Sequence, residues 1–285
     1  MQPPFTCPTK TWRNDTYESI SPSRPELSVA GKTVVIFGAG SGIGRETALA
    51  FAAAGADRVA LLGRTKSTLD ETAAQVSAIG KSSTSVHVAD VVNEDELKGA
   101  AASIGNWHIL VLASGYCPSP GQVATAEIED WWKAYEINVK GVVLTAKAFL
   151  PTAQGPNAAF LGITSETSVL PAAYLAGLSP YVSSKIAQAK VFEFLAAENP
   201  DIFVATVHPG MIETDNFYRT GASPDNLPMD KVQLPAHFLV WLASPEAAFL
   251  RGQCAWANWD VEELKAQKDK FIGKLFMTIG SKGLL

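Results

Sequence analysis

Thr33-Val34-Val35-Ile36-Phe37-Gly38-Ala39-Gly40-Ser41-Gly42-Ile43-Gly44 is the stretch that decides the fold. The run before the glycines is mostly apolar and rich in β-branched residues, as in a buried strand. Residues 46–52 after the glycines favour a helix, which Gly55 ends. Such a turn binds pyrophosphate because its backbone can approach the phosphates and the helix N-terminus presents free N–H groups. A glycine-rich turn is often only a turn, but the strand and helix around this one favour a nucleotide site.

Bulk properties indicate one large domain inside the cell. The chain has 285 residues, 47% hydrophobic and 18% charged, enough for a sizeable core. A net charge of −5 without a basic block argues against a nucleic-acid partner. Cys7, Cys117 and Cys254 are too far apart to suggest a disulfide framework or a metal site. Residues 1–26 lack the apolar core of a signal peptide, and no apolar run has membrane-spanning length. We therefore expect a cytoplasmic protein with no membrane partner.

Short apolar runs alternate with helical patterns from Gly31 onward. We expect strands at 33–37, 59–62, 85–88, 109–112, 158–163, 203–207 and 253–257, and helices at 46–52, 67–79, 94–104, 127–150 (in two pieces), 181–197 and 229–243. This alternation predicts an α/β fold, a parallel sheet covered on both faces by right-handed βαβ units. We expect residues 1–27 to be an N-terminal extension, either packed or loose. Residues 261–285 are expected to be a helical tail. Within that tail, the run 261–271 is expected to be a solvated amphipathic helix and not a partner site.

Residues 211–228 interrupt the alternation after the sixth expected strand. The segment is rich in Gly, Pro, Asp and Asn and carries Phe217 and Tyr218. Loops after the carboxyl ends of parallel strands surround the ligand in open α/β sheets. We expect this segment to be a mobile lid.

Tyr181 and Lys185 lie four residues apart on one expected helix and share a face. An ammonium about 4 Å from the hydroxyl would favour the phenolate by roughly 4 kcal/mol, or about 3 pKa units. That shift would bring Tyr181 near neutrality, where proton transfer is efficient. The pair alone could arise by chance, but it follows the fifth strand of a nucleotide-binding sheet.

These pieces resemble the short-chain dehydrogenase/reductase family over nearly all of residues 30–260, and the N-terminal extension and C-terminal pattern look like fungal members. The resemblance rests on Gly38-xxx-Gly42-x-Gly44, Asp90-Val91, Asn138, Ser165, Tyr181-Val182-Ser183-Ser184-Lys185 and Pro209-Gly210-x-Ile212-x-Thr214, in this order. It implies a Rossmann-like doubly wound sheet in a single domain, residues 28–260. It also implies a nicotinamide cofactor and hydride transfer between that cofactor and a carbonyl or alcohol.

The resemblance implies roles for a set of residues. Tyr181 would transfer the proton, Lys185 would hold the nicotinamide ribose and lower the pKa of Tyr181, Ser165 would bind the substrate oxygen, and Asn138 would fix a relay water. Asp90 and Val91 would meet the adenine, and Ile212 and Thr214 the nicotinamide amide. The full cofactor-binding set is Gly38, Ser41, Gly42, Ile43, Gly44, Arg64, Thr65, Asp90, Val91, Ala113, Ser114, Gly115, Tyr181, Lys185, Pro209, Ile212 and Thr214. No metal is expected, and the four histidines, which do not cluster, are read as structural.

Simpler roles remain open for three of these residues. Asn138 could also cap the second piece of a broken helix, Asp90 could cap a helix or turn, and Thr214 could be an ordinary loop hydroxyl. The serine is ambiguous as well. The family usually places it thirteen residues before the tyrosine, where this chain has Ser168, whereas Ser165 directly follows the expected strand. We favour Ser165, with an enlarged loop absorbing the difference.

The end of the second strand indicates the form of the cofactor. NAD enzymes carry an acidic residue there for the ribose hydroxyls. This chain has Gly63, Arg64 and Thr65 instead, so no carboxylate repels a 2′-phosphate and Arg64 can pair with it. We therefore expect NADP (NADPH), although Arg64 could simply be a solvated side chain.

Two departures from the family pattern occur together. Phe37 replaces a frequent Thr, and Leu112-Ala113-Ser114-Gly115 replaces Asn-Asn-Ala-Gly. A polar link between two strands has become apolar on both sides, which indicates a coordinated exchange.

The expected function is an NADP-dependent oxidoreductase, a reductase or dehydrogenase such as a ketoreductase, acting on a mainly apolar small molecule. Aromatic residues near the expected pocket point to that substrate class, and the fungal resemblance suggests a place in secondary metabolism. Alternatives are epimerisation, dehydration or cyclisation on the same fold, or a non-catalytic NADP-binding regulator. The apolar faces of residues 139–150 and 182–195 predict a homodimer or homotetramer.

Overall fold

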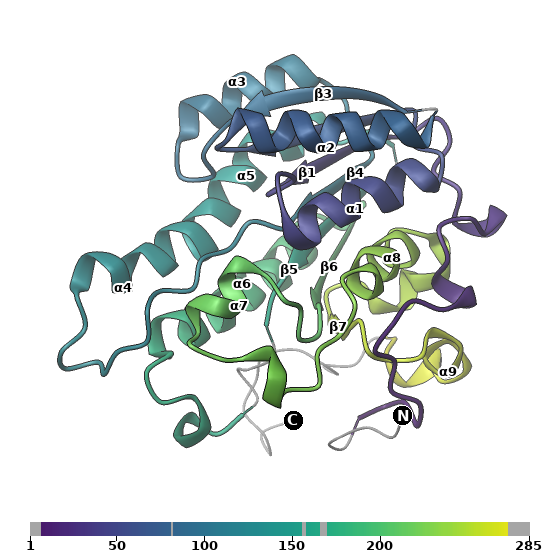
Figure 1. Ribbon diagram of the computed structural model, residues 1–285. Helices are drawn as coiled ribbons and strands as arrows, with labels where there is room; N and C mark the ends of the chain where they lie inside the picture. Colours follow the sequence, from purple (N-terminus) through teal and green to yellow (C-terminus); the bar gives the residue numbers. More distant parts are fainter. Residues whose placement is uncertain (1–6, 81, 156–157, 166–169, 273–285) are drawn as a thin grey trace.

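The computed structural model describes residues 7–272 except 81, 156–157 and 166–169. Seven parallel strands form one sheet in the order β3-β2-β1-β4-β5-β6-β7 (Figure 1). They are β1 (Thr33–Phe37), β2 (Arg58–Gly63), β3 (Ser83–Val88), β4 (Ile109–Leu112), β5 (Ala158–Ile163), β6 (Ile202–His208) and β7 (Cys254–Trp256). The predicted Rossmann-like sheet in a single domain is confirmed. Because the strand order reverses between β1 and β4, a crevice for ligands is expected at their carboxyl ends.

Helices cover both faces of the sheet (Figure 1). They are α1 (Gly42–Ala53), α2 (Lys66–Ile79), α3 (Glu94–Ile104), α4 (Ile128–Tyr135), α5 (Gly141–Phe149), α6 (Ser179–Glu198), α7 (Asp215–Arg219), α8 (Gln233–Leu242) and α9 (Val261–Ala266). Among these described helices, none is long and apolar enough to cross a membrane.

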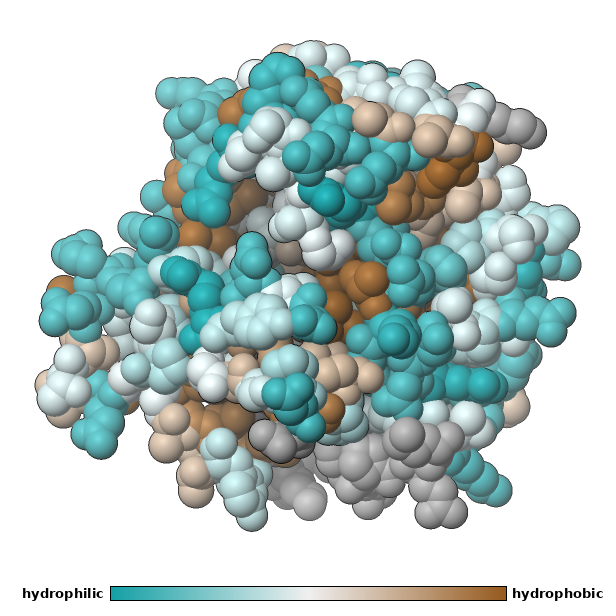
Figure 2. All heavy atoms as spheres, viewed as in Figure 1, coloured by the Kyte–Doolittle hydropathy of each residue, from teal (hydrophilic) through white to brown (hydrophobic). Residues whose placement is uncertain are grey.

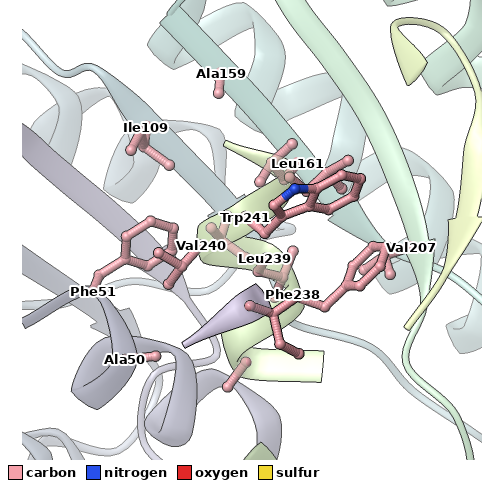
Figure 3. Packing of buried hydrophobic residues seen from close by; sticks show 14 of the residues in the cluster. Ala50, Phe51, Ile109, Ala159, Leu161, Val207, Phe238, Leu239, Val240 and Trp241 are labelled. Atoms are coloured by element: carbon pink, nitrogen blue, oxygen red, sulfur yellow. The ribbon is translucent and has the colours of Figure 1, made fainter. Parts of the chain in front are cut away.

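The strand period of two divides the core into two layers. Val34 and Ile36 join the cluster that includes α1 and α8, whereas Val35 and Phe37 join the cluster that includes α3, α5 and α6. In the first layer, Phe51 of α1 lies beside Val240 of α8, and Trp241 of the same helix points toward Leu161 of β5 (Figure 3). Such strands must be apolar on both faces, which explains their continuous apolar runs.

Several boundaries differ from the sequence predictions. The helix expected at 229–243 begins only at Gln233, because Asp230 instead pairs with the backbone of Met211. The two pieces expected in 127–150 are joined by a π-helical turn, Glu136–Lys140, and not by a cap at Asn138. The expected lid contains a short helix, α7.

Both ends of the described chain pack onto the fold. Residues 7–27, which we call the N-terminal strap, run past α8 and α9 (Figure 1) and bury Ile20 and Leu27. The amphipathic helix predicted over 261–271 covers only part of that run: α9 ends at Ala266, with Glu262 exposed and Val261 and Leu264 buried, and Phe271 beyond it is buried as well. The strap and this run cover each other, so tertiary packing replaces solvent on their apolar faces.

Packing at Gly162 in β5 yields a stability prediction. A Cβ there would lie 2.3 Å from the ring of Phe192, so Gly162→Ala should lower the free energy of unfolding by about 1–3 kcal/mol in urea denaturation. Adding Phe192→Leu should recover part of the loss. Gly99→Ala is the control, because a Cβ at Gly99 in α3 meets open space. It should raise stability by about 0.5–1 kcal/mol. Equal stability of native protein and Gly162→Ala would contradict the prediction.

Candidate active site

The glycine turn brings the backbones of β1 and α1 into direct contact. A Cβ on Gly44 would lie 2.1 Å from the carbonyl oxygen of Gly38, so only glycine fits. Ser41 stands at the N-cap of α1, but its side chain makes no capping hydrogen bond there. The first N–H groups of α1, including that of Ile43, are therefore left for another acceptor, and a phosphate suits them.

The loop after β4 meets this turn from the other side. Ala113 N donates to the carbonyl of Phe37 over 3.1 Å, and a Cβ on Gly38 would lie 2.9 Å from Ser114 N. The Ser114 hydroxyl oxygen is buried without a partner among the described residues. A buried hydroxyl without a partner beside a glycine turn can hydrogen-bond a nucleotide. The residues of this turn and loop therefore fit the nicotinamide cofactor that the sequence predicts.

The exchange of a polar for an apolar link is visible in the sheet. Phe37 and Leu112 are paired in register on β1 and β4, and both are buried. Phe37 also packs edge-to-face on Phe149 of α5, with ring centroids 5.3 Å apart. The two substitutions therefore compensate each other within one apolar layer.

The end of β2 leaves a guanidinium available. Arg64 is exposed, and its side chain makes no hydrogen bond or ion pair with any residue that the structure describes. Thr65 follows at the N-cap of α2, also without a side-chain capping bond. Lys66 is already paired with Asp70 at 2.7 Å. Arg64 is thus the cation at this strand end that is left to meet an added phosphate.

The residues after β3 have local roles. An oxygen of Asp90 accepts from Val92 N over 3.2 Å, which is the simpler turn role, while Asn93 is the cap of α3. Val91 is mostly buried and packs on Gly141 at the start of α5. Contact of Asp90 and Val91 with adenine stays a prediction.

Asn138 ties the loop after β4 to α6. It sits in the π-helical turn and is fully buried. Its Oδ1 accepts from Tyr116 N over 2.8 Å, and its Nδ2 donates to Tyr116 O and to Ser184 Oγ, both over 2.9 Å. The π turn aims this amide between the two elements, which an N-cap position would not do.

Ser165 and Tyr181 meet at the carboxyl end of β5. Ser165 is buried, and its side chain is hydrogen-bonded to Tyr181, which lies in the first turns of α6. Sequence reasoning preferred Ser165 for its position after the strand, and this contact supports that choice. Ser168 lies outside the described residues.

The surroundings of Lys185 and Tyr181 differ from those that the sequence predicts, and so do the pKa values of both residues. Its Nζ donates to Ile163 O and to Gln188 Oε1, both over 2.9 Å, and lies 5.9 Å from the centre of the Tyr181 ring. Burial lowers the pKa of Lys185 to about 7 and raises that of Tyr181 to about 12. Desolvation disfavours both charged forms and is the largest cause of each pKa shift. The expected fall of the Tyr181 pKa toward neutrality is therefore wrong for this arrangement.

The segment after β6 reaches back to the glycine turn. Pro209 begins it, and Ile212 is buried and pairs with Asp230 in an isolated β-bridge. Thr214 caps α7 by accepting from Phe217 N over 3.3 Å, and its methyl lies 3.1 Å from where a Cβ of Gly42 would stand. Residues from β1, β4, β5 and β6 thus converge at one edge of the sheet.

Sequence reasoning missed three residues at this convergence. Cys117 is buried close enough to influence the pKa of both Tyr181 and Lys185. Asn216 bridges the loop after β4, donating to Gly115 O over 3.0 Å and accepting from Cys117 N over 3.3 Å. Gln188 holds Lys185. Of these, only Gln188 had a signal, since it lies three residues after Lys185 on the same helix.

The expected lid rests on the site. Arg219 of α7 donates to Cys117 O over 3.1 Å and to the Tyr116 hydroxyl over 2.9 Å, and it stacks on the Tyr116 ring. The same hydroxyl bonds Asp130 of α4. Figure 2 shows apolar residues exposed on the surface between α1 and α7. Whether this segment opens in solution stays a prediction.

The four histidines have structural contacts: His87, His108 and His237 form hydrogen bonds with Ser85, Thr33 and Thr16, and His208 packs on a tryptophan. His208 stacks edge-to-face on Trp256, and burial lowers its pKa to about 4. Within the described ranges, no group of three or more His, Cys, Asp or Glu could hold a metal ion.

Comparisons with known proteins agree on the family. The family model described as short chain dehydrogenase matches residues 32–224. A short chain dehydrogenase/reductase of Claviceps purpurea is 35% identical and covers 96% of this chain and 94% of its own length. AacuD, a short chain dehydrogenase/reductase of Aspergillus aculeatus, is 30% identical and covers 97% of both chains. Among solved structures, L-sorbose reductase of Gluconobacter frateurii, complexed with NADPH and L-sorbose, is 25% identical, covers 81% of this chain and 96% of its own, and has a TM-score of 0.72.

The chain therefore belongs to the short-chain dehydrogenase/reductase family. It is an oxidoreductase of a family that uses nicotinamide cofactors and acts on small molecules.

The buried Lys185 predicts a pH dependence of stability. An unfolded lysine keeps its proton up to about pH 10.4, whereas the folded pKa is about 7. Between these values the unfolded state binds more protons, so this lysine makes stability rise with pH. In urea titrations, the difference in stability between native protein and Lys185→Met should rise toward pH 10 by up to about 1.4 kcal/mol per pH unit.

Lys140→Met is the control for loss of a positive charge, because Lys140 is exposed. Parallel stability curves for native protein and Lys185→Met would show that Lys185 does not titrate in this range.

Proposed function

We propose that the protein is an NADP-dependent reductase or dehydrogenase that transfers hydride between the nicotinamide and a carbonyl or alcohol of a mainly apolar small molecule. The observation that carries the proposal is the hydrogen bond between Ser165 and Tyr181 beside the buried Lys185. A non-catalytic regulator would have no use for this arrangement. Similarity to fungal relatives supports a place in fungal secondary metabolism.

The nicotinamide supplies or accepts the hydride when it is bound. Tyr181 is protonated at neutral pH, because burial raises its pKa to about 12, so its hydroxyl can donate a proton to a carbonyl oxygen. Ser165 would orient that oxygen through its own hydroxyl, and Lys185 would hold the nicotinamide ribose. Asn138 links the loop after β4 to α6 through Tyr116 and Ser184. A relay water held by Asn138 stays a prediction.

NADP in preference to NAD is supported by the unpaired Arg64 and by the NADPH named with the sorbose reductase. The glycines, Ser114 and the segment 209–214 would hold the rest of the cofactor.

A cytoplasmic location is part of the same proposal.

A homo-oligomer is a further part of the proposal. The outer faces of α5 and α6 form a shallow groove lined by Val143, Leu150, Val191, Phe194 and Leu195. Val143 and Phe194 are 48% and 60% exposed. A second copy of the chain would bury this apolar surface.

Arg64 gives the test of cofactor form. Calorimetric titration should show NADPH binding more tightly than NADH. Arg64→Ala should weaken NADPH binding roughly tenfold to a hundredfold, because a charge-assisted pair to the 2′-phosphate is lost, and leave NADH binding unchanged. Arg64→Lys keeps the charge without the bidentate fork and should fall between the two. Equal affinities of the native protein for NADPH and NADH would exclude NADP preference.

Tyr181 gives the test of catalysis. Once a substrate panel followed by NADPH absorbance has found a turned-over compound, Tyr181→Phe should reduce the rate by ~10²–10⁴-fold while the melting temperature and NADPH affinity persist. Ser165→Ala should also lower the rate, and Ser168→Ala should do little. Tyr135→Phe on α4 is a matched control outside the site. A native-like rate from Tyr181→Phe would rule out this mechanism.

A further inference from the structure

The N-terminal strap is joined to the segment after β7 by two reciprocal hydrogen bonds, one between backbones and one from a side chain. Arg13 N donates to Asn258 O over 2.8 Å, and Asn258 Nδ2 donates back to Arg13 O over 2.8 Å. Next to this pair, Trp12 and Trp259 form an isolated antiparallel bridge. These contacts fix the position of the residue that follows, Asn14.

Asn14 meets a buried carboxylate. Its Nδ2 donates to Asp230 Oδ1 over 2.6 Å, and its carbonyl accepts from Lys231 N over 2.9 Å. Asp230 is only 8% exposed, and no ion pair to it occurs among the described residues. Its charge is therefore compensated by hydrogen bonds from Asn14, from the backbone of Met211 and from the side chain of Asn258, so each donor matters.

The other oxygen of Asp230 holds the segment after β6. Met211 N donates to Asp230 Oδ2 over 2.7 Å, and Asp230 N donates to Met211 O over 2.8 Å. A Cβ on Gly210, which has φ +85°, would lie 2.4 Å from Asp230 Oδ2. The carboxylate is thus pressed against the backbone of 210–211, and its position sets theirs.

We propose that Asn14 is a positioning residue that acts through Asp230 to hold residues 209–214 at the cofactor. The inference rests on the proposed function, which places this segment against the nicotinamide half of NADPH. The chain of contacts runs from the strap to Asp230, to Met211, and on to Thr214, which packs over the glycine turn. The extension before the nucleotide-binding fold therefore completes the site from the far end of the sequence.

The test compares two kinds of strap variant. Asn14→Ala removes one donor to Asp230, and Asn14→Asp keeps the size of the side chain but turns a carboxylate toward Asp230. In calorimetric titration with NADPH, Asn14→Ala should weaken binding roughly fivefold to twentyfold, and Asn14→Asp more. Tyr17→Phe is the matched control: it removes hydrogen bonds of the strap to Trp259 O and Val261 N, away from Asp230. It should change affinity by less than about twofold.

Hydrogen exchange without cofactor gives a second, independent readout. The amides of 210–212 should exchange faster in both Asn14 variants than in Tyr17→Phe. Unchanged exchange there, or an affinity loss in Tyr17→Phe equal to that in Asn14→Ala, would overturn the inference. A native protein that binds neither NADPH nor NADH would instead refute the proposed function, and the exchange result would still decide whether Asn14 positions this segment.

Discussion

The close backbone contact between Gly38 and Gly44 is the constraint on which the site depends. With no side chain at Gly44, α1 can start directly above the end of β1, so its first N–H groups point to the switch point of the sheet. Parallel strands then deliver the ends of β4, β5 and β6 to the same edge. Most candidate residues for cofactor or substrate come from these strand ends or from the helices that follow them, and Arg64 and Asp90 follow the neighbouring strands β2 and β3.

Burial sets the electrostatics of this edge. Lys185 and Tyr181 lie in a protein environment where water no longer stabilises their charged forms, so both are held toward neutrality. Two neutral acceptors, Ile163 O and Gln188 Oε1, fix the lysine amine in place. The result is a tyrosine that keeps its proton at neutral pH, as the proton donor that we propose must do.

Two segments outside the alternating pattern, α7 and the N-terminal strap, contact the loops at this edge of the sheet. Arg219 and Asn216 of α7 bind the loop after β4, and the N-terminal strap supports Asp230 behind the segment after β6. At the edge of an open sheet, no further strand covers the loops that follow the strands. In this protein, α7 and the N-terminal strap pack on those loops instead.

The sequence by itself determined the sheet and the order of its elements, because apolar periodicity and glycine spacing are local properties. The Tyr181–Lys185 spacing is local too, and it yielded a candidate site whose chemistry stays a prediction. It also favoured Ser165, whose side chain is hydrogen-bonded to Tyr181 in the structure, and the catalytic role of this serine stays a prediction. Only the tertiary structure decided the partners of Lys185, the roles of Cys117 and Asn216, and the packing of the strap on α9. Those depend on contacts between residues far apart in the chain, and on how much water burial removes, which no local pattern encodes.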